Sequence, residues 1–206
     1  MNVMNVMNVR KAHRWMGITL LLPFLGWSST GFVFFLKPGY GAAYDMPTPT
    51  TYPLESIPAL PALTDAGEIR LIRTVLGTHL LVHSNGTWRH LRAETGQAWQ
   101  PSPEELKALV TDALTRHRER YGRVVEVEGQ TVVTDTGVRI EVYWSTLSMS
   151  QKGADTRLIN ALYEIHYLRW TQIPVLDRWL GPLGLLLVLA MAVTGALLLR
   201  APRSGT

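Results

Sequence analysis

The sequence predicts a membrane protein of the α+β class, in which two transmembrane helices flank a small domain of antiparallel hairpins with one packing helix. Its apolar residues gather in two uncharged blocks, 15–36 and 179–199. Each block has about 20 residues, which at 1.5 Å per residue is enough to cross a bilayer core of about 30 Å. Between the blocks, short strand-like segments alternate with turn residues, which is typical of hairpins.

The cations around these blocks are unevenly divided between the two sides. Cytoplasmic flanks carry an excess of lysine and arginine, so the richer side is expected to be cytoplasmic. That side holds Arg10, Lys11 and Arg14 before the first block and Arg200 and Arg203 after the second, against Lys37 and Arg178 on the other side. We therefore expect cytoplasmic termini and an outer segment over about residues 38–175. No small-residue cleavage site follows the first block, so we expect an uncleaved anchor.

Composition divides the chain into seven segments. The absence of cysteine excludes disulfides, thiolate metal sites and a cysteine nucleophile. The formal charge of +4 comes mostly from the flanks of the two blocks, and no nucleic-acid motif is present. The predicted segments are a disordered tail (1–9), a cytoplasmic entry with transmembrane helix 1 (10–37), a proline-rich spacer (38–67), the outer domain (68–150), an amphipathic interfacial helix (151–173), transmembrane helix 2 (174–200) and a cytoplasmic tail (201–206).

The first hairpin of the outer domain turns at Asn85-Gly86, a dipeptide typical of two-residue hairpin loops. Strands are expected at 69–76, 78–84 and 87–92. This turn places His79, Leu81, His83, Trp88, His90 and Arg92 on one face. The opposite face carries Leu80, Val82 and Leu91 and is the expected core face. The histidine face is either an ordinary solvated surface or a surface metal site, at which His79, His83 and His90 could share Zn²⁺ or Cu²⁺.

A helix with a marked N-terminus follows the hairpin. Ser102 is the expected N-cap, Pro103 is suited to the first helical position, and Glu105 completes a capping box. The helix is expected to end by residues 117–120, and further strands are expected at 124–128, 131–134 and 138–145. A last helix, at 155–170, places Ile159, Leu162 and His166 on one stripe before Pro174.

Three segments resemble the PepSY-associated transmembrane family. They are Lys-x-His-Arg-Trp-x-Gly at 11–17, Ile-His-x-Leu at 165–168, and Leu-Gly-Pro-Leu-x-Leu-Leu-Leu with Val-Thr-Gly at 180–195. Residues 89–99 also look like the end of a PepSY repeat, and residues 103–145 look like another repeat. The resemblance covers nearly the whole chain after residue 10. It implies a periplasmic PepSY-like domain anchored in a bacterial inner membrane.

Larger members of this family look like ferric-siderophore reductases that hold b-type haem with histidines. The resemblance implies His13 and His166 as haem-iron ligands. The helical face of His13 continues through Gly17, Phe24 and Ser28 to Gly31, which would suit either a flat macrocycle or close helix packing. The chain departs from those reductases in having two membrane helices rather than four or more, and in lacking a flavin or nicotinamide motif.

The positions of the two histidines lead to a dimer hypothesis. One is expected at each membrane face, about 30 Å apart, so they cannot ligate one iron. A homodimer on an axis along the membrane normal would pair His13 with His13 and His166 with His166. The first interpretation is thus a haem b protein that passes electrons outward from an unidentified donor, with a ferric siderophore as the substrate. The alternative is a non-enzymatic, membrane-anchored PepSY module that serves a partner protein as regulator or accessory subunit.

Overall fold

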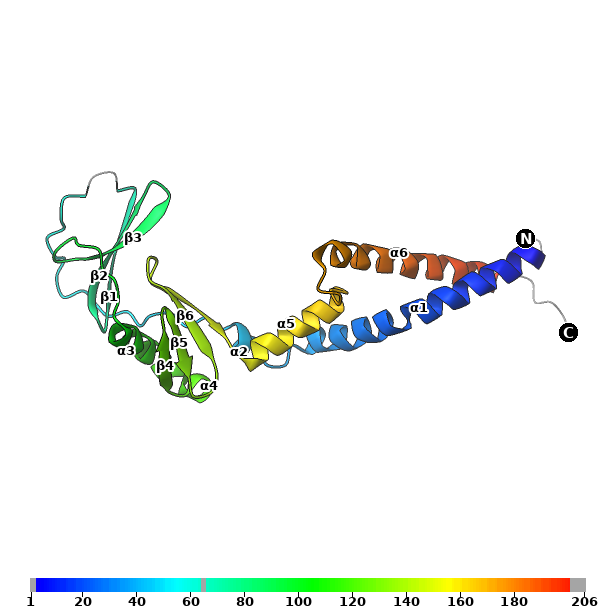
Figure 1. Ribbon diagram of the computed structural model, residues 1–206, viewed down its shortest axis with the longest axis horizontal. Helices are drawn as coiled ribbons and strands as arrows, with labels where there is room; N and C mark the ends of the chain where they lie inside the picture. Colours follow the sequence, from blue (N-terminus) through cyan, green and yellow to red (C-terminus); the bar gives the residue numbers. More distant parts are fainter. Residues whose placement is uncertain (1–2, 64–65, 201–206) are drawn as a thin grey trace. The chain divides into compact units, whose positions relative to one another are not determined.

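The computed structural model describes residues 3–63 and 66–200, and these divide into two units (Figure 1). Residues 1–38 and 158–206 form the first, which we call the helical unit, and residues 39–157 form the second, which we call the β unit. The predicted α+β class is confirmed, with antiparallel hairpins that are flanked in the sequence by two long apolar helices. The predicted cytoplasmic tail at 201–206 lies outside the described residues.

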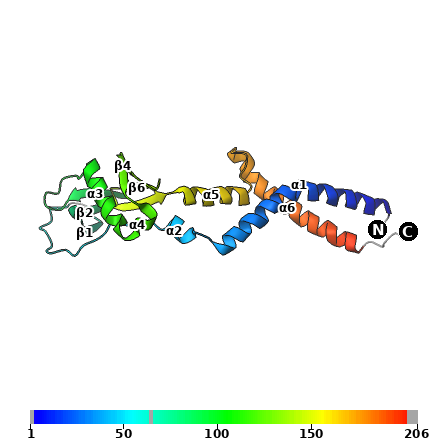
Figure 2. The same ribbon diagram turned by 90° about the horizontal axis from the view of Figure 1, so that it is seen from below.

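The helical unit consists mainly of α1 (Val3–Leu36) and α6 (Pro174–Leu199), together with most of α5 (Ala154–His166). The helices α1 and α6 pack against each other: Figure 1 shows α6 beside α1, and Figure 2 shows that the two helices cross. Both helices are long and apolar enough to cross a membrane, with mean hydropathies of 1.6 and 2.4 over their most apolar stretches. Most of their side chains are exposed, which is compatible with helices that have lipid as their solvent.

Small residues let α1 and α6 approach each other. Gly184 of α6 is buried beneath the indole of Trp27, where a Cβ atom would come within 3.1 Å of the ring. Farther along, Gly17 of α1 faces the sulfur of Met191. Leu20 is buried between these two points of the chain, at 1% exposure. Helices in lipid gain little from burying apolar surface against each other, so this close packing is what holds such a pair together.

Residues 3–9 of the N-terminal repeat belong to α1, whereas the sequence predicts a disordered tail at 1–9; residues 1–2 lie outside the described ranges. The helix begins at Val3 and runs without interruption into the apolar block. Nothing in the repeat breaks a helix, since it contains neither proline nor glycine. Extending an existing helix also avoids the nucleation cost that makes short isolated helices unstable.

The β unit contains two antiparallel sheets with sequential strand order. The predicted hairpin register is confirmed, because His83 pairs with Trp88 and Leu81 with His90. The first sheet holds β1 (Glu68–Thr74), β2 (Gly77–Ser84) and β3 (Thr87–Arg92), and the second holds β4 (Val124–Glu128), β5 (Thr131–Thr134), β6 (Arg139–Tyr143) and β7 (Ser148–Lys152). The helices are α2 (Tyr40–Tyr44), α3 (Pro103–Ala113) and α4 (Arg118–Tyr121), with a 3₁₀ turn at Leu114–His117.

The N-terminus of α3 agrees with the prediction in detail. The Ser102 hydroxyl accepts the amide of Glu105, and the Glu105 carboxylate accepts the amide of Ser102, which completes the capping box. The apolar stripe of the helix is buried: Leu106, Leu109, Val110 and Ala113. This stripe joins the first and second sheets in one core, together with Trp99 and Trp144.

The strand β2 is buried on both faces, so the expectation of one solvated histidine face is wrong. Leu80 and Val82 lie in a small core on one side, as predicted. On the other side Leu81 belongs to the main core, which the indoles of Trp99 and Trp144 close over the hairpin. Trp99 follows the hairpin closely and donates its amide to the carbonyl of His90, whereas Trp144 comes from the turn after β6. Hairpin alternation alone could not reveal either cover.

Some element boundaries also differ from those predicted. The segment expected to be an interfacial helix at 151–173 opens with the end of β7, and its helix spans Ala154–His166 only. The strand β7 was not predicted, because Ser148–Lys152 alternates polar residues with a single methionine. Within the proline-rich spacer, α2 is a short helix, and Tyr52 forms an isolated bridge with Arg73.

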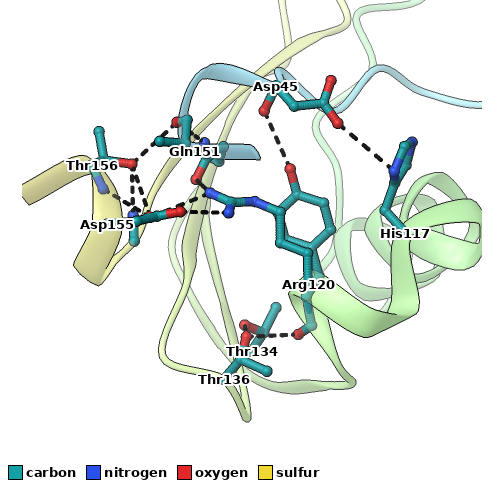
Figure 3. A network of polar contacts seen from close by, with 11 residues as sticks. Asp45, His117, Arg120, Thr134, Thr136, Gln151, Asp155 and Thr156 are labelled. Atoms are coloured by element: carbon teal, nitrogen blue, oxygen red, sulfur yellow. Dashed lines mark hydrogen bonds and ion pairs between the residues drawn. The ribbon is translucent and has the colours of Figure 1, made fainter. Parts of the chain in front are cut away.

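A polar network fastens α2 to the end of the second sheet within the β unit (Figure 3). The Arg120 guanidinium donates to Asp155 at 2.5 Å and to the side-chain oxygen of Gln151 at 3.1 Å. In turn, the amide of Gln151 and the hydroxyl of Thr156 both donate to the carbonyl of Ala43. The hydrogen bond from Arg120 lowers the pKa of Asp155, because it stabilises the carboxylate.

Candidate functional site

His13 is held by a threonine on the opposite long helix. Its Nδ1 lies 2.9 Å from the hydroxyl oxygen of Thr194. That hydroxyl also reaches back to the carbonyls of Ala190 and Met191, at 2.9 and 3.0 Å. A hydroxyl has one hydrogen and a carbonyl can only accept. All these contacts are therefore satisfied when Thr194 donates to its own helix and the Nδ1–H of His13 donates to Thr194.

His166 is held in the same way by Thr30 of α1. The Nδ1 of His166 lies 2.9 Å from the hydroxyl oxygen of Thr30, which donates to the carbonyl of Gly26 at 2.6 Å. The same reasoning makes Nδ1 of His166 the donor. In both sites the neutral imidazole then carries its lone pair on Nε2, which is the form that binds a metal ion. Within the described part of the chain, no hydrogen bond reaches either Nε2.

The end of α5 fixes the backbone of His166. The Trp27 indole donates to the carbonyl of His166 at 2.7 Å and so satisfies one of the free carbonyls at the helix end. Beyond it, Leu168 adopts a left-handed conformation at φ 56°, and Arg169 donates back to Glu164. This is a Schellman motif in which Leu168 occupies the C′ position, where glycine is usual. Leu168 is 5% exposed, so its burial offsets the backbone strain.

The two histidine sites lie far apart along α1. Thr30, which contacts His166, follows His13 on one continuous helix by 17 residues. At 1.5 Å per residue the separation is about 25 Å. Both imidazoles are half-buried. They cannot ligate one metal ion, and each site supplies a single nitrogen ligand.

The face of α1 that continues from His13 through Gly17, Phe24 and Ser28 to Gly31 divides between two environments. Gly17 lies in the contact with α6, and Gly195 of α6 leaves room for the His13 ring, since a Cβ there would come 3.4 Å from its Cε1. Phe24 is half-buried and meets Trp27 edge to face. Ser28, by contrast, is exposed, and Gly31 has open space beside it. Close helix packing therefore accounts for the N-terminal half of this face only.

Aromatic rings surround the His166 site. The Phe34 ring lies 5.1 Å from the imidazole, edge to face, and is stacked on Tyr163 at 4.5 Å. Tyr167 also meets the imidazole edge to face, with 5.7 Å between ring centroids. These rings make the surroundings of the imidazole predominantly apolar, as a bound macrocycle would require.

The structure brings together two of the three hairpin histidines and separates the third. His79 and His90 are buried at 0% and 6% exposure, with 2.8 Å between Nδ1 of the first and Nε2 of the second. His83 is half-buried instead, beside the ring of Trp88. Among the described residues, no group of three or more histidine, aspartate or glutamate side chains is placed to hold a metal ion.

The buried pair forms a hydrogen-bonded chain with one direction. The Trp144 carbonyl can only accept, so Nδ1 of His90 donates to it at 2.7 Å. Nε2 of neutral His90 then accepts from Nδ1 of His79, and Nε2 of His79 accepts from the Thr74 hydroxyl at 2.6 Å. All four ring nitrogens are occupied, which leaves no lone pair for a metal ion. The indole of Trp99 stacks on His79 at 4.5 Å.

Burial of this pair changes its acid–base behaviour. Desolvation, followed by the nearby His90 and Arg92, lowers the pKa of His79 to about 3. Desolvation also lowers the pKa of His90, although the hydrogen bond to the Trp144 carbonyl acts in the opposite direction. The pair is therefore neutral at physiological pH and serves as a polar core that joins the first sheet to the turn after β6.

Sequence reasoning missed the two threonines that hold His13 and His166. Thr194 lies in the Val-Thr-Gly segment, and Thr30 lies between two serines and a glycine. A polar residue inside an apolar helix is a recognisable pattern, because its hydroxyl must find a partner in lipid. The pairing across helices could not be read from the sequence.

Comparison with protein families, curated proteins and solved structures finds no match to this chain.

Proposed function

We propose that this protein is a haem-binding membrane protein of the PepSY-associated transmembrane type, with His13 and His166 as axial ligands. One observation carries the proposal: each histidine is anchored through Nδ1 to a threonine of another helix. Histidines that bind metals commonly donate their second nitrogen to a fixed acceptor, which sets the tautomer and orients the ring. Haem bound at these sites would supply one-electron transfer.

The two sites are proposed to lie near opposite faces of the membrane. His13 lies beside Arg10, Lys11 and Arg14, which favour the cytoplasmic face. The separation of about 25 Å along α1 is close to the thickness of a bilayer core, about 30 Å. This arrangement suits outward transfer of electrons from a cytoplasmic donor to a ferric chelate, such as a ferric siderophore, at the periplasmic face of a bacterial inner membrane.

A homodimer is proposed to complete both sites. Each site offers one imidazole, whereas b-type electron carriers commonly have two axial ligands. A two-fold axis along the membrane normal would bring a second His13 to the first site and a second His166 to the other. The exposed lateral surfaces of α1 and α6 leave room for a second copy. The dimer would then contain four membrane-spanning helices.

The same contacts also favour a second function. A histidine–threonine hydrogen bond between helices stabilises helix pairs in lipid without any cofactor, by about 0.6 kcal/mol on average. The chain would then be a non-enzymatic anchor that presents the β unit to a partner protein as regulator or accessory subunit. In that case the imidazoles hold α1 against α6 and α5, and Nε2 of each histidine has no ligand role.

An absorption spectrum separates the two functions. The full-length protein, purified in detergent from cells supplied with haem, should show a Soret band that shifts when dithionite reduces the iron. Adding a ferric siderophore should restore the oxidised spectrum. His13→Ala and His166→Ala should each weaken the band. His117→Ala is the matched control, because His117 is exposed in the β unit beside Asp45. A protein without a Soret band supports the anchor function.

A further inference from the structure

A small cationic pocket lies in the β unit, remote in the chain from both histidine sites. It occupies about 290 Å³ where α3, α4 and the start of β4 meet. Its polar side chains are Lys107, Thr111, Arg118 and Arg123, and its apolar floor is formed by Leu114 and Val124. Leu114 is 2% exposed and belongs to the main core, so the floor is part of the folded unit.

The charged side chains that line this pocket are all cationic. Lys107, Arg118 and Arg123 all line it, and no aspartate or glutamate does. Within the described ranges, none of these three cations has a carboxylate within ion-pair distance, whereas six other arginines do. Those six are Arg70, Arg73, Arg92, Arg120, Arg139 and Arg169. Three like charges around one hollow repel each other, and a bound anion would relieve that repulsion.

The backbone sets the positions of two of the cations. Gly122, between α4 and β4, has φ 65° and ψ −129°, a conformation that only glycine adopts readily. Its amide donates to the carbonyl of Arg118, and the amide of Arg123 donates to the carboxylate of Asp135. Asp135 does not line the pocket, although its carboxylate lies beside Gly122. The turn consequently fixes Arg118 and Arg123 on either side of one glycine.

We propose that this pocket binds a phosphate-type oxyanion, either free in solution or carried by a phosphate ester such as a lipid headgroup. Guanidinium groups match the geometry of phosphate oxygens and bind them through paired hydrogen bonds. The ammonium of Lys107 and the hydroxyl of Thr111 add two further kinds of donor at the same hollow. The assignment uses no residue of the helical unit and stands independently of the haem proposal.

The test titrates the full-length protein, in a non-ionic detergent and a chloride buffer, with inorganic phosphate by calorimetry. Saturable binding is expected, and Arg118→Gln and Arg123→Gln should each weaken it at least about tenfold. Arg116→Gln is the matched control, since it removes the same charge two residues from Arg118 and does not line this pocket. The control should change the affinity less than about twofold.

A second arm identifies the source of the phosphate. Short-chain phosphatidylglycerol, added as monomers, should compete with inorganic phosphate for the same site. Tighter binding of the lipid identifies a headgroup as the ligand, and tighter binding of phosphate identifies a free anion. The proposal is overturned if neither probe binds saturably. It is also overturned if Arg116→Gln weakens binding as much as Arg118→Gln, since the effect would then be one of diffuse charge.

Discussion

Replacing His79 should make the stability of the β unit much less dependent on pH. The folded state holds this side chain neutral, because burial lowers the pKa of His79 to about 3. In the unfolded chain its pKa is about 6.5. The unfolded state therefore binds more protons below pH 6.5. The stabilisation that comes from keeping His79 neutral is fully present above that pH and is lost as the pH falls toward 3. His90 acts in the same direction.

The size of the effect follows from the difference in pKa. Between about pH 7.5 and about pH 5, the unfolded His79 takes up a proton that the folded His79 does not. Linkage gives a loss of about 2 kcal/mol for this residue over that interval. Because His79 is 0% exposed, solvent does little to screen this cost.

The assay is urea denaturation of the full-length protein in detergent at the two pH values, followed by tryptophan fluorescence. His79→Gln should be less stable than the natural protein at the higher pH by about 1–3 kcal/mol, because Thr74 and His90 lose a buried partner. It should also lose about 2 kcal/mol less on acidification. His83→Gln is the control, since His83 is half-buried at the end of the hairpin. Equal pH dependence in His79→Gln and the natural protein would refute the reasoning.

Three further predictions follow from single contacts. Ser102→Ala should cost about 1 kcal/mol, because it removes the acceptor of the α3 cap, and the urea midpoint measures this. Gly122→Ala should destabilise the protein by more than Gly129→Ala; both positions have positive φ, but only Gly122 is crowded, and thermal melting compares them. If haem is bound, Thr30→Val and Thr194→Val should each weaken its retention about 10–100-fold, measured by transfer to apomyoglobin. Unchanged retention in both would contradict an orienting role for the threonines.

Patterns that depend only on neighbouring residues predicted much of the fold. The two apolar blocks specified α1 and α6, and α6 begins at the predicted Pro174. The Asn85-Gly86 turn specified the register of β2 and β3. The capping residues at Ser102 and Glu105 specified where α3 begins. In each case the chemistry that fixes the element lies within a few residues of it, so the sequence displays it directly.

Features of the fold that depend on contacts between different segments of the chain could not be predicted. The burial of His79 and His90 is completed by Trp144, which packs onto the hairpin from the turn after β6, together with Trp99 from the segment that follows β3. A local pattern shows which side chains share a face, but not what covers that face. The strand β7 is specified by its pairing with β6 rather than by its own alternation.

The candidate site was predicted in part for the same reason. His13 and His166 were identified from their places beside apolar blocks and from a family resemblance. Their partners, Thr194 and Thr30, lie 181 and 136 residues away in the chain. Only the folded helices reveal that each histidine contacts a threonine, and this contact is what supports a ligand role for Nε2.

The ratio of haem to protein chain tests the central proposal most directly. Quantifying haem as its pyridine complex, in the purified full-length protein, should give about one haem per chain if two copies share two sites. His13→Ala and His166→Ala should each reduce the ratio to about half, and the double variant should retain none. A ratio near zero in the natural protein, or one that the double variant leaves unchanged, would contradict the assignment of these two histidines as haem ligands.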